Sequence, residues 1–572
     1  MTKTLNPLDA SWLMVESRDT PMHVGGLLRF SLPADAPPDF LRKLMMEFRH
    51  TRKFSPPWNQ RLRAPSLKGL MPVWEEETEI DLEHHVRHSA LPKPGGEREL
   101  GQLIARLHSQ PLDLTRPPWE CSLIEGLADN QFALYVKMHH SLIDGIGGIK
   151  LLEKAMSPDE KASRKLLPFW AAGTTAAKPR RSRKPAPTTA EVIGSVVEMV
   201  KGQVGSLPDI ARAFGSMIGA LRNKEETLQV PFDTPISIIN GRIHGQRRFA
   251  TQRYELARLK ALADASGSTL NDVVLALCGG ALRRFLVEIG ELPDKPLTAG
   301  IPVSVRPKDD EGTGNAITFI ISTLGTDIDD PIERLEAITA STKRAKAHVQ
   351  SLPKRAMTQY TMLLMAPYML SLLSGVGGRT RPMFNITISN VPGPDKPLYY
   401  RGARLEAAYP VSLVTHGQAL NITCQSYAGW LAFGFTGCRD TLPHMQRIAT
   451  YTGKALEELE VLLLGESKKP APVRKARARK AAAPAPVVAK PKAKAAPRKR
   501  VKPRCRSDVH VATGATGRSL SRRKRRSYKL RHCGSAAGQR VGWAELHPAQ
   551  RCRPPVLGTV ELCPTYAMGV KA

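Results

Sequence analysis

Two stretches that are poor in large apolar side chains divide this chain, and they constrain its fold more than any other feature of the sequence. Residues 171–188 are rich in Pro, Lys and Arg, and the chain beyond residue 466 opens with a Lys/Ala/Pro low-complexity segment. Neither composition can bury a hydrophobic core. We therefore expect a folded block over residues 1–170, a linker and helical connection over 171–235, a second block over 236–466 and a disordered basic tail over 467–572.

The basic charge of the chain is concentrated in the predicted tail. Residues 467–572 hold 28 Lys and Arg against 3 Asp and Glu, so most of the net charge of +32 belongs to this segment. Such a tail would bind polyanions, nucleic acid included, without sequence preference. An anionic lipid surface is an equally suitable partner for this charge. A polyanion-binding protein is thus one hypothesis, but it gives no role to the two blocks.

The N-terminus and the cysteines both favour a cytoplasmic protein. The opening residues MTKTLNPLDASW lack the basic and then apolar pattern of a secretory signal. The cysteines of the two blocks are far apart and form no C-x-x-C pair, which is typical of a reducing compartment and argues against structural zinc; they are Cys121, Cys278, Cys424 and Cys438.

One apolar segment has two interpretations. Residues 362–373 (MLLMAPYMLSLL) are too few to span a membrane, for which a helix needs about 20 apolar residues. We favour a buried core helix, and the alternative is an interfacial segment that touches lipid or lines a channel for lipid entry.

Both blocks mix helical and strand patterns, which predicts an α/β fold made of two similar units side by side. Residues 131–138 alternate between apolar and more polar side chains and predict a half-buried strand. Further strands are expected at 248–254, 297–305, 316–324, 384–389, 420–427 and 430–436, and helices at 40–48, 256–265 and 270–288.

The chemically informative stretch is His139-His140-Ser141-Leu142-Ile143-Asp144-Gly145. It follows a predicted strand and precedes a predicted helix, which is where α/β sheets present side chains to a crevice. An alcohol attacks a thioester efficiently only if a base removes its proton, and histidine can take that proton and return it to the leaving thiolate. Asp144 could contact a histidine or pair with a distant Arg. Gly145 is expected to let the chain bend where a side chain would obstruct.

Metal binding and a serine nucleophile are the chemical alternatives. His140 and Asp144 are spaced for one helical face, as metal ligands can be, but no third ligand-rich motif lies nearby. A second cluster, formed by His84, His85 and His88, is more typical of a solvated patch or of structural pairing than of a metal site. The two blocks contain no G-x-S-x-G sequence.

The stretch HHSLIDG resembles the HHxxxDG motif of the CoA-dependent acyltransferase superfamily, which includes chloramphenicol acetyltransferase and the condensation domains of peptide synthetases. Five further stretches, in order along residues 1–466, resemble the bacterial wax ester synthase/diacylglycerol acyltransferase family. They are NPLD at 6–9, PMHVGG at 21–26, PPWE at 117–120 (where the family commonly has PLW), NDVV at 271–274 and SNVPGP at 389–394.

This resemblance implies a fold of two chloramphenicol-acetyltransferase-like lobes with an active-site tunnel between them. It implies that His140 is the general base and that His139 and Asp144 organise the motif. Trp119 corresponds to the tryptophan of the family's PLW stretch. The second lobe is expected to contribute Asn271 and Asp272, although a helix cap is an equally good interpretation of Asn271. Asn390 would orient substrate or shape a turn, and Arg306 would pair with Asp144.

The implied reaction is transfer of a long-chain acyl group from acyl-CoA to diacylglycerol or a long-chain alcohol, giving triacylglycerol or wax ester without a covalent acyl-enzyme. Acyl-CoA is then a substrate, and neither a metal nor another cofactor is expected. The alternative is a condensation-type enzyme that uses carrier-protein thioesters. We expect peripheral association with the inner face of the membrane or with lipid droplets. The oligomeric state stays open, with a dimer among the options.

Overall fold

The structure of the protein is a computed structural model. The structure describes residues 2–5, 7–63, 72–143, 145–172, 229, 231–304, 317–351, 364–365, 367–368 and 370–465. Asp144 and Arg306, nearly all of the predicted linker and the whole predicted tail therefore lie outside the described residues.

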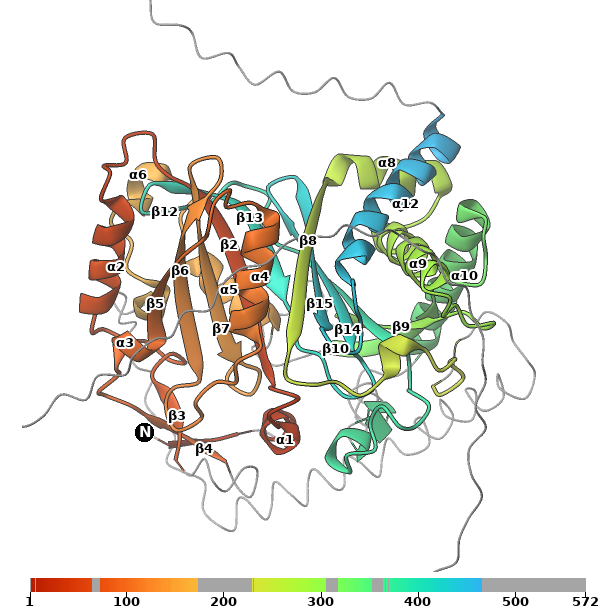
Figure 1. Ribbon diagram of the computed structural model, residues 1–572, viewed down its shortest axis with the longest axis horizontal. Helices are drawn as coiled ribbons and strands as arrows, with labels where there is room; N and C mark the ends of the chain where they lie inside the picture. Colours follow the sequence, from red (N-terminus) through yellow and green to blue (C-terminus); the bar gives the residue numbers. More distant parts are fainter. Residues whose placement is uncertain are drawn as a thin grey trace, which may run out of the picture. The chain divides into compact units, whose positions relative to one another are not determined.

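The first lobe is built on a six-stranded sheet with the order β12-β13-β2-β7-β6-β5. A three-stranded sheet of the order β1-β4-β3 and the helices α1 to α6 complete the lobe (Figure 1). The sheet strands are β2 (His23–Ser31), β5 (Val86–Ala90), β6 (Trp119–Leu127), β7 (Gln131–His139), β12 (Tyr399–Tyr400) and β13 (Ala403–Val411). The other elements are β1 (Thr2–Thr4), β3 (Gln60–Leu62), β4 (Val73–Glu76), α1 (Pro7–Val15), α2 (Phe40–His50), α3 (Leu82–His85), α4 (Glu97–His108), α5 (Gly145–Lys154) and α6 (Glu160–Ser163).

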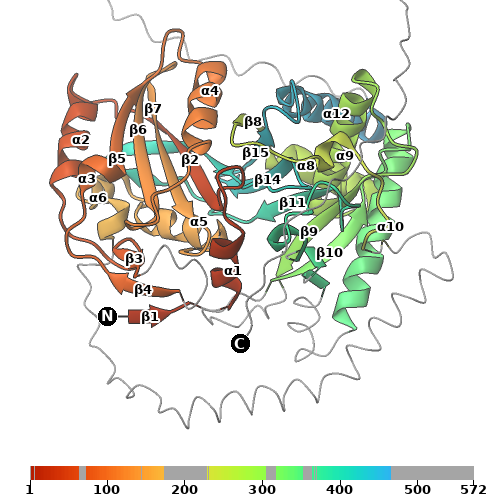
Figure 2. The ribbon, with the colours of Figure 1, turned by 60° about the horizontal axis from the view of Figure 1, so that its bottom comes forward.

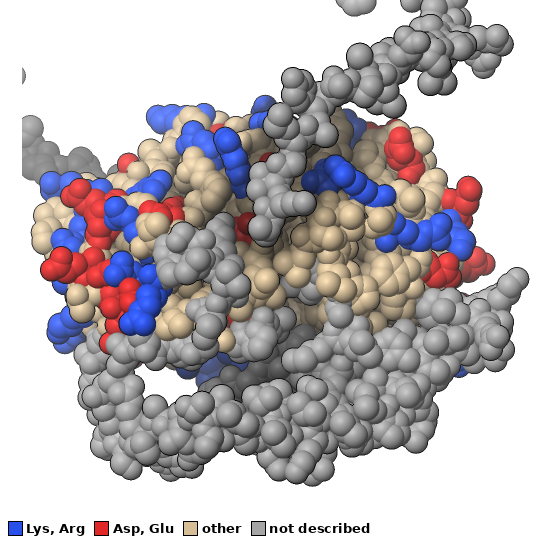
Figure 3. Space-filling view, turned by 90° about the horizontal axis from the view of Figure 1, so that it is seen from below, with Lys and Arg blue, Asp and Glu red and all other residues tan. Residues whose placement is uncertain are grey.

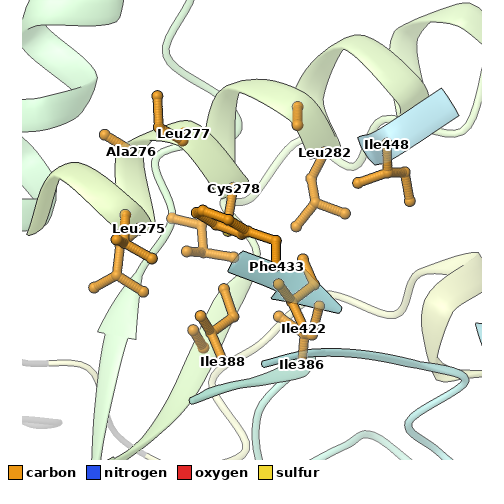
Figure 4. Packing of buried hydrophobic residues seen from close by; sticks show 14 of the residues in the cluster. Leu275, Ala276, Leu277, Cys278, Leu282, Ile386, Ile388, Ile422, Phe433 and Ile448 are labelled. Carbon is orange, nitrogen blue, oxygen red and sulfur yellow. The ribbon is translucent and has the colours of Figure 1, made fainter. Parts of the chain in front are cut away.

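The second lobe repeats this plan with a six-stranded sheet of the order β10-β9-β11-β14-β15-β8. Four long helices gather on one side of this sheet (Figure 1), and buried apolar side chains from both layers meet between them (Figure 4). The strands are β8 (Arg247–Glu255), β9 (Thr298–Ser304), β10 (Ile317–Thr323), β11 (Ile386–Val391), β14 (Leu420–Tyr427) and β15 (Trp430–Cys438). The helices are α8 (Leu256–Ser266), α9 (Leu270–Glu288), α10 (Pro331–Gln350) and α12 (Gln446–Leu464). The predicted α/β fold of two similar units is confirmed.

The second block of the chain contributes two strands to the first lobe. Strand β13 pairs antiparallel with β2 from Arg404 opposite Ser31 to Val411 opposite Gly25, with a bulge between Leu405 and Ala407. The prediction placed this stretch of chain in the second lobe, whereas the strand pairing places β12 and β13 in the first sheet, where Figure 1 labels them. In Figure 2 a cyan ribbon from this part of the chain lies among the orange strands of the first lobe. Periodicity identifies a strand but carries no information about its partner, so this sheet assignment was not predicted.

Strand β7 is buried on both faces, which corrects the prediction of a half-buried strand. All residues from Phe132 to His139 are buried, and Lys137 is only 1% exposed. Helix α4 and strand β8 of the second lobe cover the face that was expected to meet solvent, where Tyr135 packs in one cluster with Phe249. The alternating pattern therefore reflects two different buried environments.

The apolar segment at 362–373 is described only in part. Leu364 is buried, but Leu370 and Leu373 are 63% and 45% exposed, so the end of the segment does not fit the favoured prediction of a buried core helix. Among the described residues, no helix has the length and apolarity needed to span a membrane.

Candidate active site

The histidine motif begins at the last residue of β7, and two neighbouring segments hold it there. The backbone N–H of His140 donates to the carbonyl oxygen of Met22 (2.8 Å), and that of His139 donates to the carbonyl oxygen of Pro118 (2.9 Å). Met22 belongs to the PMHVGG stretch and Pro118 to the PPWE stretch. Both stretches therefore fix the backbone of the motif from the strands on either side of β7.

His139 is a fully buried residue with both ring nitrogens engaged. The backbone N–H of Ser141 donates to Nδ1 (3.1 Å), so the neutral ring carries its proton on Nε2. That Nε2–H donates to Oε2 of Glu16, 3.0 Å away, and the Glu16 side chain is only 5% exposed. The Ser141 hydroxyl also lies 2.6 Å from Nδ1. This geometry leaves His139 no free nitrogen for substrate and suits the predicted organising role.

His140 has a different environment, since its side chain is only partly buried. Its ring lies against the indole of Trp12 from α1, with the ring centroids 4.5 Å apart and the planes at 36°. An aromatic face attracts a cation, so Trp12 would stabilise an imidazolium formed when His140 accepts a proton. The two histidines therefore differ in burial and in their neighbours.

Sequence analysis did not identify Trp12 or Glu16. Both lie in or just after α1, the helix that begins with the NPLD stretch and ends close to the motif. The sequence held one partial indication of a role for Glu16, which is that this acidic residue directly follows a mostly apolar helix. Nothing local indicates that its carboxylate contacts a histidine 123 residues further along the chain.

The rest of the motif is described only in part. Asp144 and Arg306 lie outside the described residues, so their predicted pairing remains a prediction. A Cβ on Gly145 would meet no atom of the described chain within 4 Å, so no described neighbour requires a glycine there. The crowded position is Gly148, where a Cβ would lie 2.9 Å from Sδ of Met138. Gly148 therefore allows α5 to pack closely on β7.

Trp119 belongs to the core of the first lobe. It is fully buried, its Nε1–H donates to the carbonyl oxygen of Trp58 (2.7 Å), and its ring stacks on His85 with centroids 4.6 Å apart. Burial lowers the pKa of His85 to about 4. Trp119 thus holds the start of β6 in the core, next to the end of β7. The packing of the neutral His85 ring against Trp119 gives His85 a structural role.

Asp272 is part of a helix cap in the second lobe. Thr269 is the N-cap of α9, and the Asp272 carboxylate accepts from the backbone N–H (2.9 Å) and the hydroxyl (2.6 Å) of Thr269. Its other oxygen accepts from the Thr342 hydroxyl of α10 (2.6 Å). These bonds occupy both carboxylate oxygens within the lobe. The cap is therefore Thr269 and not Asn271, which is a partly buried residue in the first turn.

Asn390 lies near the end of β11, where it is opposite Cys424 of β14. The turn that follows is closely packed, since a Cβ on Gly393 would lie 2.2 Å from the carbonyl oxygen of Ser426. The Gly393 N–H donates to the Ser426 hydroxyl (3.0 Å). The SNVPGP stretch therefore shapes a tight connection beside β14.

A layer of buried polar groups lies behind His139 on the same face of the sheet. The ammonium group of Lys137 donates to the carbonyl oxygens of Leu107 and Gln110 and contacts Glu120 at 3.1 Å. His108 donates through Nε2 to the carbonyl oxygen of Ser412 (3.0 Å) and accepts the Tyr135 hydroxyl proton at Nδ1 (2.7 Å). Burial lowers the pKa of His108 to about 3, so its ring is neutral.

The described cysteines do not provide a nucleophile. All four are buried, and burial raises the pKa of the Cys278 thiol to about 12 and that of the Cys121 and Cys424 thiols well above the usual range. Among the described residues, no cluster of three or more His, Cys, Asp or Glu is arranged to hold a metal ion.

Two six-stranded mixed sheets, with the histidine motif at the end of a central strand of the first, make up a fold that condensation domains share. The first condensation domain of the calcium-dependent antibiotic synthetase has this fold at 16% sequence identity, with a TM-score of 0.50 over 82% of this chain and 97% of that chain.

The particular family follows from closer relatives. Residues 5–274 match the wax ester synthase/diacylglycerol acyltransferase catalytic domain and residues 313–460 the WS/DGAT C-terminal domain. The chain is 47% identical to a putative diacylglycerol O-acyltransferase of Mycobacterium tuberculosis (80% of this chain, 97% of the relative) and 39% identical to the O-acyltransferase WSD of Acinetobacter baylyi (80% and 97%). It also resembles the wax ester synthase/diacylglycerol acyltransferase from Marinobacter aquaeolei (38% identity, TM-score 0.65, 81% and 99%). The chain belongs to the wax ester synthase/diacylglycerol acyltransferase family.

Proposed function

We propose that this protein transfers a fatty acyl group from acyl-CoA to the hydroxyl group of diacylglycerol or of a long-chain alcohol, with His140 as general base. The observation that carries the proposal is the position of His140 at the end of β7. Its backbone is fixed by Met22 and its ring lies against Trp12, while the neighbouring His139 is fully engaged. The names of the relatives support the reaction class.

In the proposed reaction, the alcohol oxygen attacks the thioester carbonyl carbon while His140 accepts the hydroxyl proton. The tetrahedral intermediate collapses with cleavage of the carbon–sulfur bond, and the imidazolium of His140 returns the proton to the CoA thiolate. The products are an ester and free CoA. Because the four described cysteines are buried, and burial raises the pKa of the Cys121, Cys278 and Cys424 thiols, direct attack without a covalent acyl-enzyme is the simpler mechanism.

The test is ester formation from radiolabelled palmitoyl-CoA with hexadecanol or dioleoylglycerol as acceptor, comparing wild type with His140→Ala. Loss of the general base should reduce kcat by roughly 10²–10⁴ while the far-UV circular dichroism spectrum is unchanged. His88→Ala is a matched control, because His88 lies on an edge strand of the same sheet. An equal rate in His140→Ala and wild type would remove His140 from the mechanism. Absence of ester with wild type would favour carrier-protein thioesters as donors.

Peripheral contact with a lipid surface is the second part of the proposal. Exposed apolar side chains gather in two adjacent segments of the second lobe, and Phe232 N–H donates to the carbonyl oxygen of Met383 to join them (3.1 Å). The exposed residues are Phe232, Ile236, Leu370, Leu373 and Val376. Arg379 and Arg381 beside them are also exposed. Apolar and basic side chains together are typical of an interfacial surface. On the face in Figure 3, basic and acidic side chains lie close to one another.

Cosedimentation of the full chain with vesicles of phosphatidylglycerol and phosphatidylcholine tests this contact. Leu370→Ser/Leu373→Ser should weaken binding at high salt, where the contribution of basic charge is screened. Val461→Ser is the matched control, since Val461 is 55% exposed on α12. Unchanged binding of the double variant would exclude this surface and leave the basic tail as the candidate.

A further inference from the structure

The segment that joins α1 to β2 contacts the histidine motif at both of its ends. At one end, the Glu16 carboxylate accepts from Nε2–H of His139 (3.0 Å). At the other end, the carbonyl oxygen of Met22 accepts from the backbone N–H of His140 (2.8 Å). A displacement of this segment, residues 16–22, would therefore move groups that contact both histidines.

The middle of the 16–22 segment is a compact turn. The backbone N–H of Ser17 donates to the carbonyl oxygen of Thr20 (3.3 Å), and the N–H of Thr20 donates to the Ser17 hydroxyl oxygen (3.2 Å). The Thr20 hydroxyl donates to the carbonyl oxygen of Val15 (3.2 Å) and is nearly inaccessible to solvent. These bonds make the turn one unit, so a contact that fixes one of its residues also restrains Glu16.

Arg247, the first residue of β8 in the second lobe, contacts this turn. Its Nη2–H donates to the carbonyl oxygen of Asp19 (2.7 Å), and its Nη1–H donates to the carbonyl oxygen of His244. The side chain is only 4% exposed. Burial lowers the pKa of Arg247 to about 10, so the guanidinium is still charged at neutral pH. A buried cation is costly unless it is hydrogen-bonded, and these carbonyl oxygens supply the hydrogen bonds.

The backbone of Arg247 is fixed by α4 of the first lobe. Its N–H donates to the Ser109 hydroxyl oxygen (2.8 Å), and the Ser109 hydroxyl donates to the carbonyl oxygen of Ala105 in the last turn of α4 (2.7 Å). The preceding chain packs against the same turn, since a Cβ on Gly245 would lie 3.4 Å from the carbonyl oxygen of Arg18. The guanidinium therefore reaches Asp19 from a fixed backbone position.

A second arginine that is buried in the described chain offers a comparison. Arg334 of α10 is 5% exposed, and its Nη2–H groups donate to the carbonyl oxygens of Ile328 (3.1 Å) and Asp329 (2.7 Å). All of these residues belong to the second lobe. Arg334 thus stabilises a loop of its own lobe, whereas Arg247 joins the second lobe to the segment that serves the histidine motif.

We propose that Arg247 is a positioning residue for the acyl transfer, through which the second lobe holds the 16–22 segment and so orients His139. The guanidinium fixes Asp19, the turn passes this restraint to Glu16, and Glu16 holds the His139 ring next to the base. The inference rests on the proposed function, because it assigns Arg247 a part in that reaction. Since Arg247 acts on His139 and not on a substrate, its loss should lower kcat and leave KM near the wild-type value.

The first test replaces the guanidinium by an unbranched apolar side chain. In Arg247→Met, kcat for ester formation should fall about tenfold to a hundredfold, with KM within about twofold of wild type, because small displacements of catalytic groups are costly. Arg247→Lys keeps a cationic donor and should recover part of kcat. A wild-type kcat in folded Arg247→Met would overturn the inference.

Arg253→Met is the matched control for this test. Arg253 also lies on β8 and also donates to a backbone carbonyl oxygen of the first sheet, that of Glu406 (3.1 Å). Glu406 is near the end of β2 that is remote from the histidine motif. Arg253→Met should therefore have a wild-type kcat, and a fall equal to that of Arg247→Met would mean that any contact between the lobes has this effect.

A double variant tests whether Arg247 acts through Glu16. When Arg247→Met is added to Glu16→Ala, kcat should fall by less than about a further threefold, because the losses of groups that act as a unit do not multiply. If the two losses multiply, Arg247 does not act through the 16–22 segment and the inference is wrong.

A second variant addresses misfolding. Thr20→Val has nearly the same shape and removes the hydroxyl that bonds to Val15, so the turn restrains Glu16 less and kcat should fall several-fold. If circular dichroism shows that the Arg247 variants do not fold, a wild-type kcat in Thr20→Val would by itself overturn the inference.

Hydrogen exchange without substrates separates this inference from the proposed function. In Arg247→Met, the peptides over residues 16–22 and 137–143 should exchange faster than in wild type, while the peptide over β14 is unchanged and Arg253→Met behaves as wild type. Faster exchange of these two peptides supports the role of Arg247 even if wild type makes no ester. Unchanged exchange, together with normal ester synthesis by wild type and Arg247→Met, would overturn the inference and leave the proposed function standing.

Discussion

The two lobes have similar sheets but bury different chemistry. In the first lobe, four histidines and Lys137 are buried among the described residues, each with a hydrogen-bond partner. In the second lobe, the space between α9 and the sheet is filled by apolar side chains such as Leu282, Ile422 and Phe433 (Figure 4). Buried titratable groups are tolerated only when they are hydrogen-bonded. The described buried histidines thus all lie in the lobe that carries the candidate base, whereas the second lobe buries carboxylate and guanidinium groups, such as those of Asp272 and Arg334, beside its large apolar core.

The largest expected effect on stability lies in the apolar core of the second lobe. Phe433→Ala should lower the free energy of unfolding by about 3–5 kcal/mol, because a fully buried ring is replaced by a cavity. Urea denaturation measures this, with the exposed Val461→Ala on α12 as control. The rate per folded molecule should stay close to wild type. A decrease of less than about 1 kcal/mol in the free energy of unfolding would mean that apolar packing is not the main source of stability in this lobe.

The pH dependence of stability should come from the first lobe. His85 has a folded-state pKa of about 4, below its ordinary value of 6.5, because burial disfavours the charged ring. The contribution of His85 to the free energy of unfolding is fully present above pH 6.5. It is lost as the pH falls toward 4, because in this range the ring binds a proton in the unfolded state but not in the folded state. The loss should be about 3 kcal/mol.

Urea denaturation at pH 7 and pH 4 measures that loss. His85→Phe keeps an aromatic ring against Trp119 and should reduce the difference between the two pH values. His50→Gln, at the exposed end of α2, is the control and should not. If the free energy of unfolding falls by the same amount in His85→Phe and in wild type between pH 7 and pH 4, His85 does not contribute to the pH dependence of stability.

Glu16 tests whether the polar geometry around His139 matters for the reaction. Glu16→Ala removes the acceptor for Nε2–H and should lower kcat by up to about a hundredfold, because small displacements of catalytic groups are costly. Glu16→Gln retains an acceptor oxygen and should lose less, with a changed pH profile of kcat. Glu83→Gln, exposed on α3, is the control. A wild-type rate and profile in Glu16→Ala would show that His139 needs no orientation.

The smallest effect is expected at Asp272. Asp272→Ala removes the cap interaction and the bond to Thr342, and it should destabilise the protein by about 1–2 kcal/mol with kcat unchanged. Asn271→Ala, the neighbour with no part in the cap, should have a smaller effect on stability. A large fall in kcat for Asp272→Ala at unchanged stability would instead support the sequence-based prediction that Asp272 shapes the site.

Local patterns in the sequence predicted many elements closely. Helix α9 and strand β14 have the predicted residue ranges, because an apolar period with a cap at Thr269 and an alternating strand are properties of neighbouring residues. The position of His140 between a strand and a helix followed from the same patterns. The burial of Lys137 did not, because the covering α4 and β8 are distant in sequence from β7.

By itself, therefore, the sequence determined the two α/β blocks, the histidine motif and the resemblance to one acyltransferase family. Only the tertiary structure decided which distant groups serve that motif. It brought Glu16 to His139 and Trp12 to His140, and it paired β13 with β2. The physical reason is that periodicity and capping act over one or two turns, whereas strand partners and buried polar contacts depend on the packing of the whole lobe.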